Sequence, residues 1–209
     1  MAGFNWALDP RKCLTLAEAR RLRRTARKDA KAPGGKRPNV LVRDCFIVEL
    51  ALATGLRVME IAQVNCGDVD LDAASPLLMV RNGKGGKKRL VRFSLAFRNL
   101  CRRYLRWKQA VGEGTSPGDP LLVSSNTGRH MTTRAIQKAF KRCAARAGLP
   151  GRYSIHCLRH TYACELYRAG GYNLRLVQKQ LGHARIATTQ VYADVMDPDM
   201  RRAVERLYR

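Results

Sequence analysis

Acidic residues are scarce in this chain. Its 209 residues include 16 Asp and Glu against 40 Lys and Arg, which gives a formal net charge of +24 at pH 7. A field of that size attracts polyanions. Nucleic acid is the first candidate partner, an anionic membrane surface the second, and an RNA scaffold of the ribosomal type the third.

Long hydrophobic runs are also missing. The longest apolar run, Cys45 to Leu56, falls short of the roughly 18 residues of a membrane span and contains Glu49, so we expect a core helix there. The first residues, Met1 to Asn5, lack the charged and apolar regions of a secretory signal. These absences argue against a membrane partner and predict a cytoplasmic, nucleoid-associated protein.

The cysteines are also neither even in number nor regularly spaced. The seven cysteines are irregularly spaced, which argues against a disulfide framework and predicts reduced, mostly buried thiols. Cys157, His160 and Cys164 lie close together, but their spacing matches no zinc motif and no second cluster follows. We therefore expect neither a metal nor a cofactor.

The chain length suits a single domain, 1–209, and no repeat, low-complexity tract or long linker divides it. Capping and turn signals predict a mostly helical α+β fold, with a basic helix and loop in 1–39 and a tail helix in 197–209. The expected strands are 77–81, 89–93 and 121–124, with a hairpin turn at 82–87. The expected helices are 15–29, 39–54, 57–64, 94–111, 132–148, 156–169 and 173–181, with short helices around 192 and from 197.

Groups suited to phosphate chemistry occur in four short segments. These segments are Thr54–Glu60, His156–His160, Leu181–His183 and Tyr192. Arginine binds phosphate oxygens in bidentate fashion, histidine transfers protons near neutral pH, and a tyrosine hydroxyl can act as a covalent nucleophile. Together these groups could attack a phosphodiester without a metal.

Arg57 and Glu60 lie one turn apart on a predicted helix, so they share a face. A surface ion pair is one interpretation. The apolar neighbours Leu56, Val58 and Ile61 indicate instead a largely buried helix, where an arginine needs a partner or a ligand. The residues alone leave both interpretations open.

His156, Arg159 and His160 share one face of another predicted helix, and His156 lies near its positively polarised N-terminus. The alternative is a packed histidine pair beside a salt-bridged arginine. His183 follows Gly182 at a helix end, where the alternative is a residue that only caps the helix. The glycine-rich turn 82–87 could let the backbone approach a phosphate closely, or it could be an ordinary solvated turn.

With the segment Gly83–Lys87, these motifs follow one another over roughly residues 40 to 195 in the order found in tyrosine recombinases, also called phage integrases. The chain resembles the catalytic domain of that family. The resemblance implies a helical domain with a small three-stranded antiparallel sheet. Family members also carry an N-terminal DNA-grasping domain of about a hundred residues. Since only some 40 residues precede the catalytic region, we expect that domain to be absent.

The resemblance also implies a reaction. Tyr192 would attack the scissile phosphate, forming a 3′-phosphotyrosyl link and releasing a 5′-hydroxyl, with no need for ATP or a metal. Lys84 would be the general acid that protonates the departing oxygen. Seven tyrosines occur in the chain, and Tyr208 is the second choice as nucleophile.

The same resemblance assigns the phosphate-binding groups. Arg57 and Arg159 would clamp the phosphate oxygens, with His156 and His183 supporting them. Glu60 would hold the site in place. His160 would be a packing residue behind it.

The partners expected on this basis are double-stranded DNA and further copies of the chain. The residues expected to contact DNA are Arg23, Arg24, Arg27, Arg81, Lys87, Lys88 and Arg89. The family exchanges strands as a DNA-bound dimer or tetramer through a four-way (Holliday) junction. The tail helix 197–209 would dock on a neighbouring protomer.

The predicted function is therefore site-specific recombination, as in the integration of mobile elements. A type IB-like topoisomerase would use the same nucleophile without exchanging partners. A regulator or architectural protein would keep the fold and bind DNA without cutting it. An RNA-binding scaffold is the third alternative.

Overall fold

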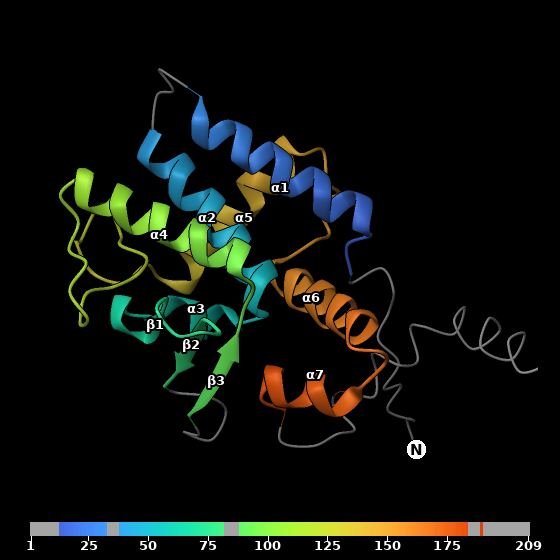
Figure 1. Ribbon diagram of the computed structural model, residues 1–209. Helices are drawn as coiled ribbons and strands as arrows, with labels where there is room; N and C mark the ends of the chain where they lie inside the picture. The colour runs from blue at the N-terminus through green and yellow to red at the C-terminus, as the bar shows by residue number, and fades with distance from the viewer. Residues whose placement is uncertain (1–12, 33–37, 82–87, 184–188, 190–209) are drawn as a thin grey trace, which may run out of the picture.

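The computed structural model describes residues 13–32, 38–81, 88–183 and 189 of the chain (Figure 1). Within these ranges the predicted mostly helical α+β fold with a small antiparallel sheet is confirmed. The elements are α1 (Leu16–Lys31), α2 (Pro38–Thr54), α3 (Val58–Ala62), a 3-10 turn (Cys66–Asp68), β1 (Val69–Asp70), β2 (Leu77–Val80), β3 (Arg89–Arg92), α4 (Leu95–Ala110), α5 (Thr133–Arg146), α6 (Ile155–Ala169) and α7 (Leu174–Leu181). Among the described helices, none is both long and apolar enough to cross a membrane.

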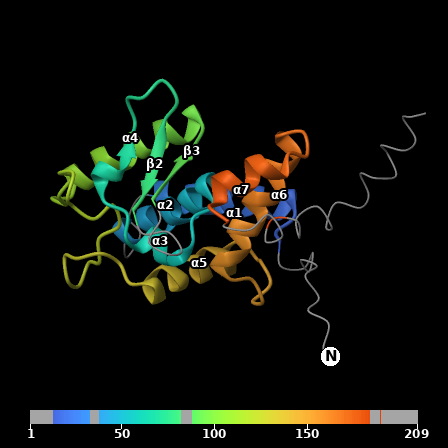
Figure 2. The same ribbon diagram turned by 90° about the horizontal axis from the view of Figure 1, so that it is seen from below.

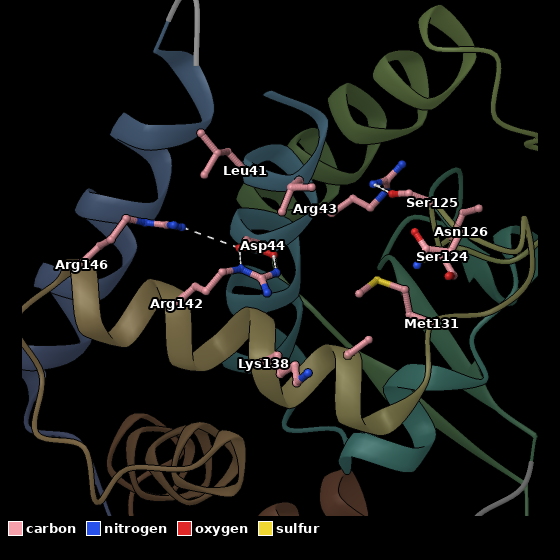
Figure 3. A pocket seen from close by; sticks show the side chains of 13 residues that line it. Leu41, Arg43, Asp44, Ser124, Ser125, Asn126, Met131, Lys138, Arg142 and Arg146 are labelled. Atoms are coloured by element: carbon pink, nitrogen blue, oxygen red, sulfur yellow. Dashed lines mark hydrogen bonds and ion pairs between the residues drawn. The ribbon is translucent and has the colours of Figure 1, made fainter. Parts of the chain in front are cut away.

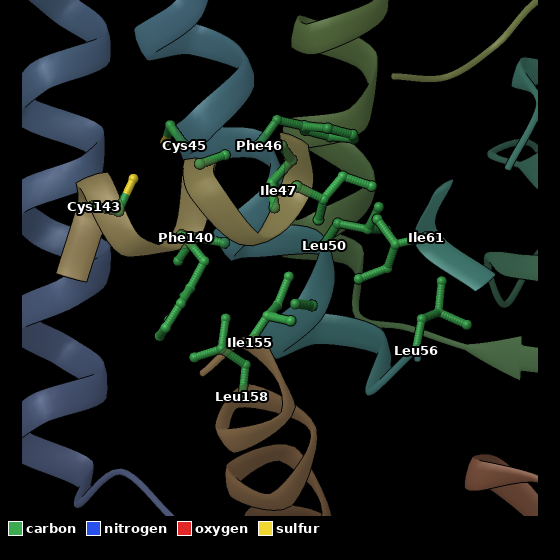
Figure 4. Packing of buried hydrophobic residues seen from close by; sticks show 14 of the residues in the cluster. Cys45, Phe46, Ile47, Leu50, Leu56, Ile61, Phe140, Cys143, Ile155 and Leu158 are labelled. Carbon is green, nitrogen blue, oxygen red and sulfur yellow. The ribbon is translucent and has the colours of Figure 1, made fainter. Parts of the chain in front are cut away.

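Helix α2 forms the centre of the core, because it carries apolar side chains on every side. Its residues 43–51 are buried without interruption, and α1, α4, α5 and α6 all pack against it. Phe46, Ile47 and Leu50 lie in one cluster with Phe140 of α5 and Leu158 of α6 (Figure 4). Since α3 follows α2 directly, this packing fixes α3 and α6 relative to each other.

The sheet has the order β1-β2-β3, and both strand pairs are antiparallel. Leu78 of β2 is paired with Val91 of β3, and both are buried, while Met79 and Leu90 on the opposite face are exposed. This alternation is the pattern expected of a half-buried antiparallel sheet. The predicted strands at 77–81 and 89–93 are confirmed, apart from their end residues.

The third strand was wrongly predicted at 121–124, because β1 (Val69–Asp70) fills that place instead. Leu121 and Leu122 are both buried, which breaks the alternation of a strand. Their backbones bond in two directions. Leu121 N–H donates to Val64 O, and Met131 N–H donates to Leu122 O, each at 2.9 Å. The segment is therefore a buried connector between the α3 region and α5.

Side-chain caps set the helix ends. Thr15 and Glu18 form the predicted capping box at the start of α1, and Asn173 caps α7. Gly182 ends α7 with a φ of 67°, the left-handed conformation that glycine adopts without strain. The predicted turn 82–87 and the predicted helices around 192 and in 197–209 lie outside the described residues.

Candidate functional site

Segments far apart in the sequence bring charged side chains together. Arg57 is the N-cap of α3, Arg89 begins β3, Arg159 lies in the second turn of α6, and His183 follows α7. Helix α7 packs against both α6 and β3, and Figure 2 shows α7 between them. Glu60 of α3 lies among the three arginines. We call this group, Arg57, Arg89 and Arg159 around Glu60, the arginine cradle.

Glu60 is the hub of the arginine cradle. Its carboxylate accepts hydrogen bonds from the backbone N–H of Arg57 at 2.8 Å and from Arg57 Nη1 at 2.9 Å. Arg89 donates to both oxygens, Nη1 to Oε1 and Nη2 to Oε2, each at 2.8 Å. Burial alone would raise the Glu60 pKa, but the hydrogen bonds from Arg89 and Arg57 prevail and lower it to about 2. Glu60 is therefore ionised at neutral pH.

The arginine cradle carries more positive than negative charge. Three guanidinium groups surround one carboxylate, and Arg159 Nη1 lies 3.9 Å from Glu60 Oε2. The Arg57 side chain keeps 29% of its surface exposed, against 11% for Arg89 and 6% for Arg159. A partly buried excess of positive charge is suited to an oxyanion such as phosphate. The interpretation of Arg57 and Glu60 as an isolated surface pair is therefore wrong.

Arg159 is fixed by backbone carbonyl groups at two helix ends. Its Nη1 donates to Gly55 O at 2.5 Å and its Nη2 to Leu181 O at 3.0 Å. Gly55 lies between α2 and α3, and Leu181 ends α7. Arg159 thus ties the start of α3 to the end of α7, and the guanidinium cannot move without disturbing both.

His183 is oriented by hydrogen bonds to both ring nitrogens. Arg159 Nη2 donates to Nε2 at 3.0 Å, and Nδ1 lies 3.0 Å from Thr189 Oγ1. Because an arginine can only donate, Nε2 accepts, and the neutral ring carries its proton on Nδ1. Burial, followed by the positive charges of Arg159 and Arg57, lowers the His183 pKa to about 4. His183 is therefore neutral at physiological pH.

The turn that places His183 requires glycine for two reasons. Gly182 has a φ of 67°, and a Cβ atom there would lie 2.5 Å from Arg89 Cδ. The left-handed backbone strains other residues, and the contact would push Arg89 away from Glu60. The arginine cradle and the His183 turn are thus packed directly against each other.

His156 lies in the first turn of α6 and is solvent-exposed. Partial burial of its ring and the charges of Arg159 and Arg57 lower its pKa. His160 is half-buried, and its electrostatic interaction with His183 is the smallest contribution to the low pKa of His183. The structure thus places His156 within electrostatic range of Arg159 and Arg57, and His160 within that of His183.

Three of the predicted residues, Lys84, Lys87 and Tyr192, lie outside the described ranges. Thr189, three positions before Tyr192 in the sequence, is fully buried, and its Oγ1 lies 3.0 Å from His183 Nδ1. Lys88 is exposed next to β3. Arg81 forms an ion pair with Asp68 and keeps half of its side chain exposed.

The basic helix α1 has a structural task that the sequence did not reveal. Arg23 donates from Nε at 3.0 Å and from Nη2 at 2.8 Å to Glu49 Oε2, and Arg27 Nε donates to Glu49 Oε1 at 2.6 Å. Glu49 is buried in α2, so these two arginines neutralise a carboxylate inside the core. Both remain about half exposed, and Arg24 beside them is exposed.

Arg89 is the residue whose place was missed. Its charge predicted a contact with DNA, whereas its Nη1 and Nη2 both bond to the Glu60 carboxylate. Strand alternation contains the missing signal, because Arg89 shares a face with the buried Val91. A cation on the inward side of a strand requires an anionic partner.

A cavity of about 490 Å³ lies between α2, α5 and the segment 123–131 (Figure 3). Asp44 at its wall accepts bonds from Arg142 Nε at 2.8 Å and Nη2 at 2.6 Å, and Arg146 lies 3.7 Å away. Arg43 donates to Ser125 Oγ at 2.7 Å. Among the described residues, its lining contains none of the predicted catalytic residues, so we interpret the bonds of Asp44 as structural links between α2 and α5.

Known proteins resemble this chain over most of its length. Tyrosine recombinase XerD of Ralstonia nicotianae is 39% identical over 192 residues, which cover 92% of this chain and 59% of that protein. The crystal structure of XerA recombinase matches with a TM-score of 0.74 and 30% identity, over 93% of this chain and 64% of that one. XerH site-specific recombinase, solved in a pre-cleavage complex with its difH substrate, matches with a TM-score of 0.71 and 26% identity. The match covers 90% of this chain and 50% of that one.

The chain thus spans between half and two thirds of the length of these relatives. The arginine cradle and the His183 turn both fall within residues 13–198, which match the Phage integrase family. The fold, the charged constellation and the comparisons agree, and we conclude that the chain belongs to the phage integrase family of tyrosine recombinases.

Proposed function

We propose that this protein is a site-specific DNA recombinase that cuts and rejoins DNA through a 3′-phosphotyrosyl intermediate. The observation that carries the proposal is the arginine cradle, in which one buried carboxylate holds three arginines beside a neutral histidine. The relatives of this chain are named recombinases, and XerH was solved with the difH substrate bound.

In this proposal the scissile phosphate binds at the exposed edge of the arginine cradle. Arg57, the most exposed of the three, and Arg159 neutralise the charge that grows on the non-bridging oxygens during attack. Groups that are already in position stabilise such a transition state without reorganising, which is usually the largest catalytic term. His183 and His156 complete the phosphate site, and Glu60 holds it together.

Tyr192 is proposed as the nucleophile. Thr189, three positions earlier in the sequence, bonds to His183, and this short sequence separation supports a position for Tyr192 close to the phosphate. The Tyr192 hydroxyl gives its proton to His156 as its oxygen attacks phosphorus in line, an O–P bond forms, and the bond to the 5′-oxygen breaks. Lys84 gives its proton to the departing oxygen. The 5′-hydroxyl of another strand then reverses these steps, which exchanges the strands.

The proposal is tested by trapping covalent protein–DNA complexes from genomic DNA of the source organism and sequencing the attached ends. Tyr192→Phe is the test variant, and Tyr208→Phe is the matched control. We expect adducts at a defined sequence with the wild type and the control, and none with Tyr192→Phe. Adducts that persist in Tyr192→Phe would overturn the choice of nucleophile. Relaxation of supercoils without strand exchange would favour a topoisomerase, and binding without adducts a regulator.

Double-stranded DNA is the proposed substrate, with the nucleoid in the cytoplasm as the place of action. The net charge of +24 supports binding along a phosphate backbone. Among the predicted contacts, Arg24 and Lys88 are exposed, while Arg23, Arg27 and Arg81 are about half exposed in ion pairs.

We further propose that the chain acts as an oligomer, because exchange between two duplexes needs several active sites at once. The predicted tail helix 197–209 has an apolar face. A groove of about 570 Å³ between α2, α4, α6 and α7 contains apolar side chains such as Leu52, Phe97, Leu100 and Leu166. We propose this groove as the docking site for the tail of a neighbouring protomer.

Two independent changes test that assembly. Truncation after Met196 removes the tail, and Leu176→Glu places a charge in the groove at a side chain that is 41% exposed. Both are expected to abolish tetramers on DNA in light-scattering measurements while leaving DNA binding by the monomer. Tetramers that form normally with either variant would contradict the docking site.

A further inference from the structure

The segment that leads into α1 is held against α6 by two contacts. The backbone N–H of Leu14 donates to Thr161 Oγ1 at 2.9 Å, and Thr161 is itself anchored within α6 by a bond to Cys157 O at 2.8 Å. Next to this anchor, the sulfur of Cys13 lies 3.8 Å from the sulfur of Cys164. The two cysteines are 151 positions apart in the sequence, yet they face each other with the neighbouring backbone already fixed.

We propose that Cys13 and Cys164 form a redox-modification site, in which hydrogen peroxide produces an intramolecular disulfide between the segment before α1 and α6. The sulfur atoms must approach to about 2.05 Å for this bond. Cys13 precedes α1 and is only half-buried, so rotation of its side chain can supply the approach.

Cys164 is the sulfur that reacts first. The hydrogen bond from Cys13 lowers the Cys164 pKa against the opposing effect of burial, and the nearby Arg168 lowers it further. A lower pKa increases the thiolate fraction, which is the nucleophilic form. The Cys13 thiol stays protonated, because its hydrogen bond to Cys164 and its burial both raise its pKa.

The reaction balances with one peroxide. The Cys164 thiolate attacks an oxygen of hydrogen peroxide, an S–O bond forms, the O–O bond breaks, and the released hydroxide takes up a proton to become water. The Cys13 sulfur then attacks the sulfenic sulfur, the S–S bond forms, and the S–O bond breaks. The hydroxide leaves with the Cys13 proton as a second water. The two thiols lose two electrons, and the peroxide gains them.

The test is peptide mapping of the full chain after peroxide treatment and alkylation of the remaining thiols. Trypsin without reductant releases Cys13 in peptide 13–20 and Cys164 in peptide 160–168. We expect these peptides as one linked species, lighter than their sum by two hydrogen atoms, and separable by a dithiol reductant. The matched variant Cys157→Ser is expected to keep the linked species, and Cys13→Ser, at the half-buried position, to lose it.

A second readout is the thermal unfolding of the oxidised wild type. Closure of a loop of 151 residues should raise the unfolding midpoint by roughly 5 °C or more, and reductant should reverse the shift. The proposal is overturned if the two peptides are recovered only in alkylated form. It is equally overturned if either cysteine is linked to a different partner.

Discussion

Replacing Glu60 by glutamine should destabilise the protein and separate its phosphate-binding arginines. The Glu60 carboxylate accepts hydrogen bonds from the backbone and side chain of Arg57 and from both ends of the Arg89 guanidinium. Glutamine keeps the shape but loses the charge, and its amide N–H groups would face the arginine donors. Arg57, Arg89 and Arg159 would then repel one another in a partly buried site.

The size of this effect follows from two independent magnitudes. Removing one partner of a buried ion pair costs about 3–5 kcal/mol. The Glu60 pKa is lowered from 4.5 to about 2, because bonds from Arg89 and Arg57 outweigh burial, and this shift corresponds to about 3 kcal/mol at neutral pH. We therefore expect the midpoint of thermal unfolding to fall by about 6–20 °C in Glu60→Gln.

The contribution of Glu60 to stability should fall as the pH falls. Folding lowers the Glu60 pKa, so its contribution to stability is fully present above the unfolded value of 4.5 and is lost as the pH falls toward 2. The difference in unfolding midpoint between wild type and Glu60→Gln should be largest at neutral pH and should shrink in acid. Circular dichroism melts at several pH values measure it directly.

The matched control is Glu165→Gln. Glu165 bonds to Arg168 at 2.8 Å, but both side chains are exposed, by 41% and 50%. An exposed pair of this kind contributes about 0.5 kcal/mol or less, so this variant should melt close to the wild type. Equal effects of the two substitutions, or a Glu60→Gln effect that does not change with pH, would refute the reasoning.

Three further predictions concern neighbouring groups. His183 should titrate near pH 4 in an NMR experiment, because burial and the adjacent arginines lower its pKa. Its protonation should reduce the stability of the fold only as the pH falls from 6.5 toward 4, because the unfolded state binds the proton first. A titration near 6.5 would contradict the hydrogen bonding described. Arg89→Met should slow DNA cleavage at least about tenfold with little change in DNA affinity, while Arg92→Met, at an exposed position on the same strand, should change neither. Arg24→Glu should weaken DNA binding without changing the unfolding midpoint. Arg27→Glu should lower both DNA affinity and the unfolding midpoint, because Arg27 bonds to the buried Glu49 carboxylate.

Local signals in the sequence predicted those parts of the fold that local interactions decide. Thr15, Ser94 and Thr132 each cap a helix whose start the sequence places at that residue. Gly182 ends α7 as its position indicates. Caps and left-handed turns depend on a few neighbouring residues, so one sequence is enough to find them.

Connections over long sequence distances were beyond that reach. The connector 121–124 looks like a strand by composition, but its Leu121 and Leu122 are buried by contacts with residues far along the chain. The pairing of Arg23 and Arg27 with Glu49 is of the same kind, since an exposed basic helix and an acid within an apolar run give no sign of touching.

The residues of the arginine cradle and His183 were each singled out in the sequence, but the bonds between them were not predicted. Spacing placed Arg57 and Glu60 on one helix face, and the resemblance supplied Arg159 and His183. The bonds of Arg89 to both Glu60 oxygens join β3 to α3, two elements whose contact the sequence does not reveal. Charge alone suggested DNA for this arginine, because a sequence does not show which cations are already satisfied.

DNA binding and DNA cleavage, measured side by side in Arg57→Lys, test most directly whether the arginine cradle acts on the reacting phosphate. Arg57 is chosen because it is the most exposed of the three arginines, and Lys keeps the charge but loses the fork geometry. At the sequence recovered from trapped adducts, we expect affinity within about threefold of wild type and single-turnover cleavage slower by about 10²-fold. Cleavage at the wild-type rate, or a loss of binding that accounts for the whole loss of cleavage, would contradict a role of the arginine cradle at the reacting phosphate.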